Sequence, residues 1–182
     1  MKFHDTSLAD AKLIELQRHG DERGFFARTM CTNEFAANGL VDAFVQINMS
    51  HSAFKGTLRG MHFQRNPHSE AKLMRCTKGA IWDCIVDLRA DSPTYLQHQG
   101  FELTAENKLQ LYVPPGFAHG FVTLVDDVEV TYPVSALYTP TAEGGVRYDD
   151  PLLGIEWPVE VVHVSDKDAA WPLLERGAAA IF

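Results

Sequence analysis

The stretch Gly56-Thr-Leu-Arg-Gly-Met-His-Phe-Gln64 combines a strand-like run with an arginine and a histidine that are three residues apart. Residues three apart in an extended strand point to opposite faces, so Arg59 and His62 share one cavity only if the strand is interrupted between them. Gly60 lies between them, and glycine is a residue that often marks a bulge. We therefore expect a bulge at Gly60 and one cavity that receives both side chains.

A second stretch completes a pattern that is similar to the cupin signature. Gly56 and His62 are separated by five residues, as in the first cupin motif, and Pro114-Pro-Gly-Phe-Ala-His119 has the Pro-x-Gly-x-x-His spacing of the second motif. A tight turn at the glycine would return the chain and carry His119 into the interior. We therefore expect His62 and His119 to face one cavity.

The residues around His62 do not supply the ligands of a metal centre. A transition ion takes three or four nitrogen and oxygen donors, and a metal cupin offers a second histidine two residues after the first and a glutamate soon afterwards. Gln64 occupies the first of these positions, and Asn66-Pro-His68 contains no carboxylate. The sequence therefore predicts no bound catalytic metal.

Length and composition are typical of one soluble globular domain. The chain has 182 residues, of which 46% are hydrophobic and 22% charged, so we expect residues 1–182 to form a single domain. The formal net charge of −8 disfavours general binding to nucleic acid or to an anionic membrane surface. A local basic pocket for a phosphate-bearing small molecule is compatible with this charge.

The cysteines and the chain start indicate a reducing compartment. Cys31, Cys76 and Cys84 are odd in number and have no C-x-x-C spacing, so neither a disulfide framework nor a zinc site is expected. No apolar run approaches the roughly 20 residues of a membrane span, and the start of the chain lacks the apolar block of a signal peptide. We expect a cytoplasmic protein.

Short strand-like runs separated by turn residues continue from Phe44 onward and predict a β-barrel or sandwich. One such run is Gly79–Arg89, and another is Leu109–Pro114, which ends where proline prevents further pairing. Alternation in the first run places Ile81, Asp83, Ile85 and Asp87 on one face and Trp82, Cys84, Val86 and Leu88 on the other. The first of these faces is polar enough to border a site.

Tyr132 lies in a third strand-like run, Val128–Val134, with the same parity as three valines. Side chains of equal parity point to one face of a strand, so the phenol is expected to point inward. A core tyrosine whose hydroxyl is satisfied by a protein group is the alternative interpretation.

The two ends of the chain predict small peripheral elements. A strand is expected near Ala11–Leu16 and a hairpin at Asp21–Arg28, which combines a turn with two aromatic residues and two arginines. A short helix is expected over Thr32–Gly39, with Thr32 as its N-cap, and a second one over Ala169–Glu175. Asp166 or Asp168 is expected to begin that second helix.

Nearly the whole chain resembles the dTDP-4-dehydrorhamnose 3,5-epimerases of nucleotide-sugar metabolism. The resemblance rests on ordered motifs: Asp21–Phe26, Gln46–Asn48, Gly56–Gln64, Ala71–Leu73, Val86–Arg89, Pro114–Phe121, Tyr132, Asp149–Pro151 and Ser165–Asp168. It implies an all-β, cupin-type jelly-roll β-barrel with a few short peripheral helices, no cofactor and usually a homodimer. It also implies inversion of the carbons beside the C4 ketone of a nucleotide-linked 4-keto-6-deoxyhexose.

The resemblance implies a role for each of four residues. His62 corresponds to the base, and Asp168, rather than the weaker candidate Asp166, to its hydrogen-bonded partner. Lys72 corresponds to the cation near the enolate oxygen, with a surface salt bridge as its alternative role. Tyr132 corresponds to the group that returns a proton from the opposite face of the sugar ring.

Further residues correspond to substrate contacts in the family. Arg59 and His119 correspond to sugar or phosphate contacts, and Arg23 to a pyrophosphate contact that often crosses a dimer interface. The remaining contacts are Arg28, Gln46, Asn48, Glu143 and Lys167. Arg28 and Ile47 stand where the family usually has glutamate and aspartate, which leaves the preferred nucleotide base open.

Alternatives remain at this stage. A relative that inverts only one carbon, or that uses another nucleotide keto sugar, would carry the same catalytic residues. A metal-dependent cupin oxygenase or a non-catalytic sugar-binding cupin belongs to a different class, and the incomplete ligand set and the four catalytic-type residues disfavour them.

Overall fold

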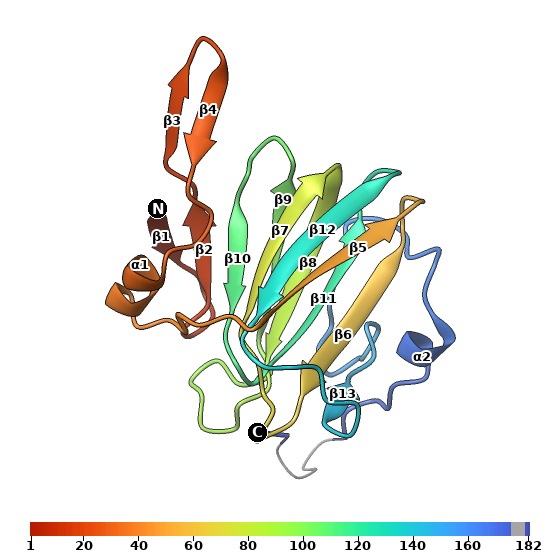
Figure 1. Ribbon diagram of the computed structural model, residues 1–182. Coiled ribbons are helices and arrows are strands. Elements are labelled where there is room, and N and C mark those ends of the chain that lie inside the picture. The colour runs from red at the N-terminus through yellow and green to blue at the C-terminus, as the bar shows by residue number, and fades with distance from the viewer. Residues whose placement is uncertain (176–180) are drawn as a thin grey trace.

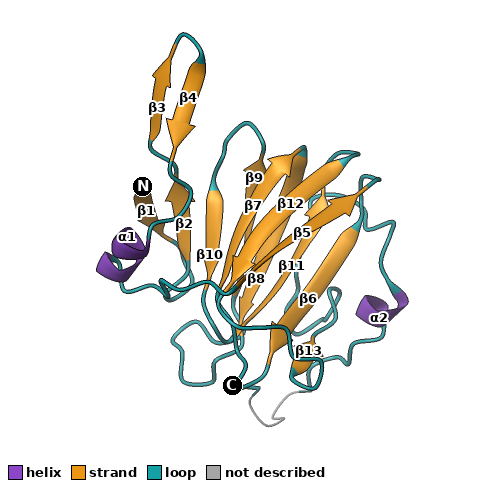
Figure 2. Ribbon diagram, viewed as in Figure 1, coloured by secondary structure: helices purple, strands orange, loops and turns teal. Residues whose placement is uncertain are grey.

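Two antiparallel sheets packed face to face form the body of the protein (Figures 1 and 2). The computed structural model describes residues 1–175 and 181–182. One sheet has the strand order β1 (Lys2–Asp5), β2 (Lys12–Glu15), β10 (Gln110–Val113), β7 (Lys72–Lys78), β12 (Val128–Val134) and β5 (Gln46–Ser52). The other has the order β13 (Glu143–Gly145), β6 (Leu58–Gln64), β11 (Phe117–Thr123), β8 (Ala80–Asp87) and β9 (His98–Thr104). The expected all-β jelly roll is confirmed.

Small elements lie outside the two sheets. Strands β3 (Arg18–Asp21) and β4 (Gly24–Ala27) form a hairpin that extends away from the body, as Figure 1 shows. The helices are α1 (Thr32–Ala37) and α2 (Asp166–Ala169), which lie on opposite sides of the molecule. In the part of the chain described, neither helix is long and apolar enough to cross a membrane.

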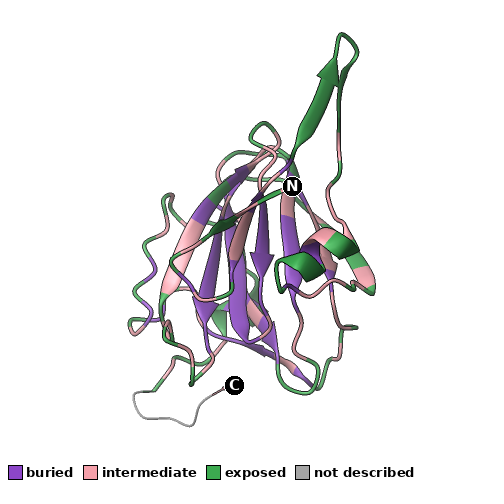
Figure 3. Ribbon diagram, turned by 90° about the vertical axis from the view of Figure 1, so that its left-hand side faces the viewer, coloured by how far each residue is buried: buried purple, intermediate pink, exposed green. Residues whose placement is uncertain are grey.

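The main core lies between the two sheets, where the buried residues of Figure 3 are concentrated. Ile81 and Ile85 of β8 belong to this core with Met74 of β7, and Tyr132 of β12 packs against it. Cys84 and Val86 lie on the opposite face of β8 and pack under Leu153. The alternation predicted for Gly79–Arg89 is therefore confirmed, and Asp83 lies on the inner face.

A smaller core joins the outer face of the six-stranded sheet to α1. Phe35 is fully buried there and makes edge-to-face contacts with Phe3 and Tyr112, at centroid distances of 5.5 and 6.2 Å. Aromatic pairs in this geometry are stabilising beyond the area they bury. This contact fixes the segment that connects the hairpin to β5.

The N-terminal end of α1 differs from the predicted one, whereas its C-terminal end agrees. The N-cap of α1 is Cys31, not Thr32, and it makes no side-chain capping bond. Gly39 follows the helix with a φ of +69°, as expected for a residue that ends a helix.

The predicted helix over Ala169–Glu175 is wrong. Helix α2 spans Asp166–Ala169 instead, and its N-cap is Ser165, whose side chain accepts a bond from the Asp168 backbone N–H. Pro172 explains the early end, because a residue before proline avoids the helical region. The helix does begin at one of the two expected aspartates, because Asp166 is its first residue, whereas Asp168 lies inside it.

Candidate active site

A bulge in β6 brings Arg59 and His62 to one side of the strand. The register between β6 and β11 shifts there, because His119 pairs with His62 while Phe121 pairs with Arg59. Gly60 has a φ of +136°, and a Cβ on it would lie 2.5 Å from the Cα of Gly120. Only glycine fits this close approach, so the expected bulge is confirmed.

The bulge opens onto a cavity of about 580 Å³. Seven of the predicted site residues line it: Arg59, His62, Lys72, His119, Tyr132, Lys167 and Asp168. They come from β6, β7, β11, β12 and α2, so both sheets and the C-terminal segment contribute to one site. A volume of several hundred cubic ångströms is in the range of small-molecule sites.

His62 and Asp168 form a hydrogen-bonded pair at the cavity wall. The distance from His62 Nε2 to Asp168 Oδ1 is 2.6 Å, and Asp168 Oδ2 accepts the Gly60 N–H at 3.2 Å. The side chain of His62 is 33% exposed, whereas that of Asp168 is only 6% exposed. Among the described residues His62 Nδ1 has no hydrogen-bond partner, so it is available to a ligand.

The surroundings of Asp168 favour its charged form. Burial opposes ionisation, but the hydrogen bond and charge of His62, the Gly60 N–H and the Ser165 hydroxyl outweigh it and lower the pKa of Asp168. A carboxylate at Nε2 fixes the tautomer of the ring with the proton on Nε2. Nδ1 is then the basic nitrogen.

Lys72 and Tyr132 lie near this pair in the same cavity. The Lys72 side chain is 11% exposed and forms an ion pair with Glu70. Burial and the nearby Glu70 carboxylate raise the pKa of Tyr132, while Arg59 opposes the shift. No described protein group hydrogen-bonds the Tyr132 hydroxyl, which speaks against a core tyrosine that is satisfied by the fold.

His119 is held by a buried carboxylate below the cavity. Its Nε2 lies 3.0 Å from Oδ2 of Asp83, a residue with no exposed surface. Burial raises the pKa of Asp83, and His119 opposes that shift. This pair fixes the orientation of the His119 ring at the cavity wall.

A smaller hollow of about 160 Å³ adjoins the cavity, and His62, Lys72 and Tyr132 line both. Gln46, Asn48 and Glu143 belong to this hollow. Lys167 of the main cavity donates to Glu143 at 2.5 Å, so an ion pair joins the two spaces. These four predicted contact residues therefore surround the four predicted catalytic ones.

Arg23 and Arg28 lie apart from the cavity within a single chain. Arg23 is at the turn of the exposed hairpin and pairs with Asp21 at 2.5 Å. Arg28 donates to Glu34 at 2.8 Å, and both arginines are absent from the lining of the cavity and of the adjoining hollow. One chain does not bring these two residues to the other predicted contacts.

Glu70 and Trp171 are two of the residues around the site that sequence reasoning missed. Glu70 could have been found, because it precedes Lys72 by two positions and an extended chain points both to one side. Trp171 makes an edge-to-face contact with the His62 ring at a centroid distance of 6.5 Å. No sequence signal marked Trp171, because its contact depends on how the C-terminal segment folds back.

A base, a cation and a phenol around one polar cavity are suited to moving protons next to a carbonyl, so fold and site together define an isomerase of the cupin type. The family model described as dTDP-4-dehydrorhamnose 3,5-epimerase matches residues 5–176. The chain belongs to this family.

Individual relatives are similar over nearly the whole chain. A dTDP-4-dehydrorhamnose 3,5-epimerase of Sinorhizobium fredii is 45% identical over 96% of this chain and 90% of its own length. The enzyme of that name from Bacillus anthracis, solved with TDP and PPi bound, has a TM-score of 0.91 and 47% identity, over 95% of this chain and 99% of its own. A dTDP-6-deoxy-D-glucose-3,5-epimerase from Legionella pneumophila, solved with dTDP-4-keto-L-rhamnose, has a TM-score of 0.88 and 40% identity, over 94% and 92%.

Proposed function

We propose that this protein epimerises a dTDP-linked 4-keto-6-deoxyhexose, inverting both C3 and C5. The observation that carries the proposal is the pairing of His62 with Asp168 in the same cavity as Tyr132 and Lys72. The substrate is inferred from the relatives, one of which was solved with a dTDP-linked keto sugar.

Proton removal is assigned to His62. C3 and C5 both flank the C4 ketone, so loss of either proton gives an enolate conjugated with that oxygen. Nδ1 of His62 accepts the proton, and Asp168 stabilises the imidazolium that forms while holding the ring in place. Lys72 carries a positive charge in a mostly buried position, where it stabilises the enolate oxygen.

Proton return is assigned to Tyr132. Inversion requires that the new proton arrive on the face opposite to the one that was deprotonated. Tyr132 is on β12 of one sheet and His62 on β6 of the other, so the two side chains approach the cavity from different sheets. Burial and the Glu70 charge raise the pKa of Tyr132, so the phenol stays protonated to higher pH.

Substrate contacts are assigned to the polar residues around these groups. Arg59 and Lys167 supply positive charge for the diphosphate or the sugar, and His119 supplies a fixed imidazole. Gln46, Asn48 and Glu143 lie in the adjoining hollow and offer amide and carboxylate groups to the rest of the nucleotide.

A homodimer is part of the proposal. Phe25 and Phe26 on the hairpin are 47% and 69% exposed, and Ile47 and Met49 on the edge strand β5 are 69% and 67% exposed. A two-stranded hairpin is only marginally stable alone in water, so a second copy that covers it would add stability. Arg23 and Arg28 would then act in the partner's site, and sedimentation analysis tests for the dimer.

We assign the reaction to the cytoplasm. The cysteines are unpaired thiols, and two of them, Cys76 and Cys84, are buried. Burial raises the pKa of Cys76 to about 11, which leaves it as an unreactive thiol. Such thiols fit a reducing compartment.

The experiment that tests this function uses dTDP-, GDP- and UDP-linked 4-keto-6-deoxy sugars in heavy water. We expect deuterium at C3 and C5 of the dTDP-linked sugar, together with inverted product, both read by NMR. Deuterium at one carbon only would identify a mono-epimerase, and exchange with another nucleotide alone would overturn the dTDP assignment. Stoichiometric iron or manganese in the purified protein would contradict the metal-free mechanism.

A further inference from the structure

Glu70 is a charged residue inside the site to which the proposed reaction assigns no step. Its side chain is 9% exposed, and one carboxylate oxygen forms the ion pair with Lys72. The other oxygen accepts a hydrogen bond from Gln64 Nε2 at 3.2 Å. The Glu70 carboxylate therefore connects Lys72, which the proposed reaction uses, to Gln64 of β6.

Gln64 anchors Glu70 to that framework. Its amide nitrogen lies 3.1 Å from the carbonyl of His68 and 3.3 Å from that of Leu137, and its oxygen accepts the Thr139 N–H at 2.6 Å. Gln64 is 4% exposed, so these bonds are formed away from bulk water. A carboxylate held in this way cannot move freely.

The anchored carboxylate restricts Lys72. A lysine ammonium sits on a flexible four-carbon stem, so its position depends on what holds its charged end. Lys72 must lie at one place if it is to meet the negative charge that develops on the substrate oxygen. Among the described residues Glu70 is the only ion-pair partner of Lys72.

Glu70 also acts on the second group that the reaction needs. Its negative charge disfavours ionisation of Tyr132, in addition to the larger effect of burial, and Arg59 acts in the opposite direction. The other charged or titratable groups that line the cavity or the adjoining hollow are His62, Lys72, His119, Tyr138, Glu143, His163, Lys167 and Asp168. Of all these neighbours, Glu70 is the carboxylate that favours the neutral phenol.

We propose that Glu70 is a positioning residue of the epimerase site, which holds the Lys72 ammonium against the enolate oxygen. The inference rests on the proposed function for the roles of Lys72 and Tyr132. Glu70 itself exchanges no proton with the substrate.

Two substitutions separate the effect of the charge of Glu70 from the effect of its side-chain length. Glu70→Gln removes the charge and keeps the shape, so kcat should fall about tenfold or more with KM changed less than twofold, because a misplaced group costs rate rather than binding. The alkaline limb of the pH profile should also move to lower pH, since the phenol loses a neighbour that favours its neutral form. Glu70→Asp keeps the charge and shortens the side chain, so kcat should fall while the alkaline limb stays in place.

Glu102→Gln, an exposed glutamate on β9 outside the cavity lining, is the matched control and should leave kcat, KM and the pH profile unchanged. Thermal unfolding of each variant measures any purely structural effect. Lower melting temperatures in both Glu70 variants with kcat and the alkaline limb unchanged would overturn the proposal. If Glu70→Gln does not fold, Glu70→Asp decides, because an unchanged kcat there contradicts the role in holding Lys72.

A titration without substrate separates this inference from the proposed function. Tyrosinate absorbance is measured against pH in the wild type and in Tyr132→Phe, and the difference reports Tyr132; the same pair is repeated with Glu70→Gln. The Tyr132 midpoint should be lower with Glu70→Gln, and an unchanged midpoint overturns the effect on the phenol. An inactive wild type with a shifted midpoint would refute the proposed function alone.

Discussion

Two buried aspartates, one on α2 and one at the end of β8, have similar surroundings but different proposed roles. Asp168 at the cavity and Asp87 at the end of β8 are 4% and 0% exposed, and the pKa of each is lowered although burial opposes this. Each carboxylate is paired with a nitrogen-containing side chain, Arg89 two residues later for Asp87 and His62 on β6 for Asp168. What differs is the chemistry of the partner and whether one of its nitrogens remains without a hydrogen-bond partner among the described residues.

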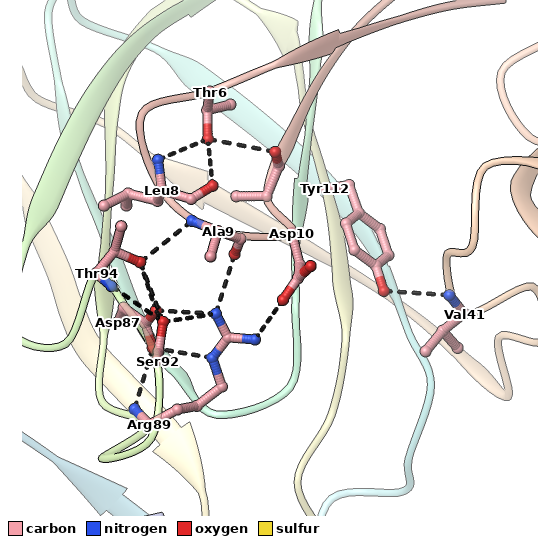
Figure 4. A network of polar contacts seen from close by, with 11 residues as sticks. Thr6, Leu8, Ala9, Asp10, Val41, Asp87, Arg89, Ser92, Thr94 and Tyr112 are labelled. Carbon is pink, nitrogen blue, oxygen red and sulfur yellow. Dashed lines mark hydrogen bonds and ion pairs between the residues drawn. The ribbon is translucent and has the colours of Figure 1, made fainter.

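The Asp87 pair belongs to a network of hydrogen bonds within the protein, as Figure 4 shows. Asp87 accepts bonds from Arg89 Nε at 2.9 Å, Ser92 Oγ at 2.5 Å and Thr94 Oγ1 at 2.7 Å. Arg89 continues to Asp10 at 2.7 Å, which ties the N-terminal segment to the loop after β8. An arginine cannot give up its proton in a protein, so this network stabilises the fold and does no proton chemistry.

The Asp168 pair is open on one side. Its partner His62 bonds Asp168 through Nε2, leaves Nδ1 without a hydrogen-bond partner among the described residues, and is 33% exposed. A carboxylate paired with a cationic or basic side chain stabilises a loop at Asp87, and in the proposed mechanism it orients the base at Asp168. The comparison predicts that substitutions in the His62–Asp168 pair lower the reaction rate. Substitutions in the Asp87–Arg89 pair should instead lower the free energy of unfolding.

The largest effect is expected for His62→Ala. Proton exchange at both carbons should fall by roughly a thousandfold or more, because general base catalysis is lost. Affinity for dTDP, measured by calorimetry, should remain close to that of the wild type, since the base acts mainly in the transition state. His98→Ala, a half-buried histidine on β9 that lines neither the cavity nor the adjoining hollow, is the control. Exchange near the wild-type rate at either carbon would remove His62 from the mechanism.

A smaller loss is expected for Asp168→Asn. The amide keeps the shape but no longer stabilises the imidazolium, so kcat should fall roughly a hundredfold while the fold persists. Asp166→Asn, two residues earlier in α2 and exposed, is the matched control and should keep its activity. A larger loss in the Asp166 variant, measured by the same assay, would exchange the roles assigned to the two carboxylates.

Asp87→Asn should leave kcat unchanged and lower the free energy of unfolding by about 2 kcal/mol, because a buried charged network loses one member. The folded-state pKa of Asp87 lies below its usual value, so its stabilisation is present above about pH 4 and is lost as pH falls through the folded pKa. The variant should therefore lose less stability on acidification than the wild type does. Asp91→Asn in the same loop, which is exposed, is the control. A fall in kcat at full stability would break the distinction between the two pairs.

The strands, the inner face of β8 and the bulge in β6 could be predicted because their sequence signals are local. Alternation fixed the inner face of β8, and Gly60 marked the bulge that turns Arg59 and His62 to one side. Pro114 marked the end of β10. Each of these inferences needs only the stereochemistry of a few consecutive residues.

The C-terminal segment could not be predicted in this way. Asp168 meets His62 across 106 positions of sequence, and Trp171 meets the same ring only because the chain folds back over β13. A short helix such as α2 is decided by these tertiary contacts rather than by its own propensity, which explains the misplaced helix after Ala169. Arg23 and Arg28 lie on the hairpin and just after it, and a single chain does not bring them to the cavity.

The most direct test of the two-sided mechanism is Tyr132→Phe in heavy water. The variant keeps the ring and loses one hydroxyl that no described protein group hydrogen-bonds. If His62 removes protons and Tyr132 returns them, the variant should still exchange substrate protons at C3 and C5, with deuterium returned mostly to the original face, while inverted product falls sharply. If exchange and epimerisation instead fall by the same factor, Tyr132 takes part in enolate formation or in holding the sugar, and the two-sided mechanism is wrong.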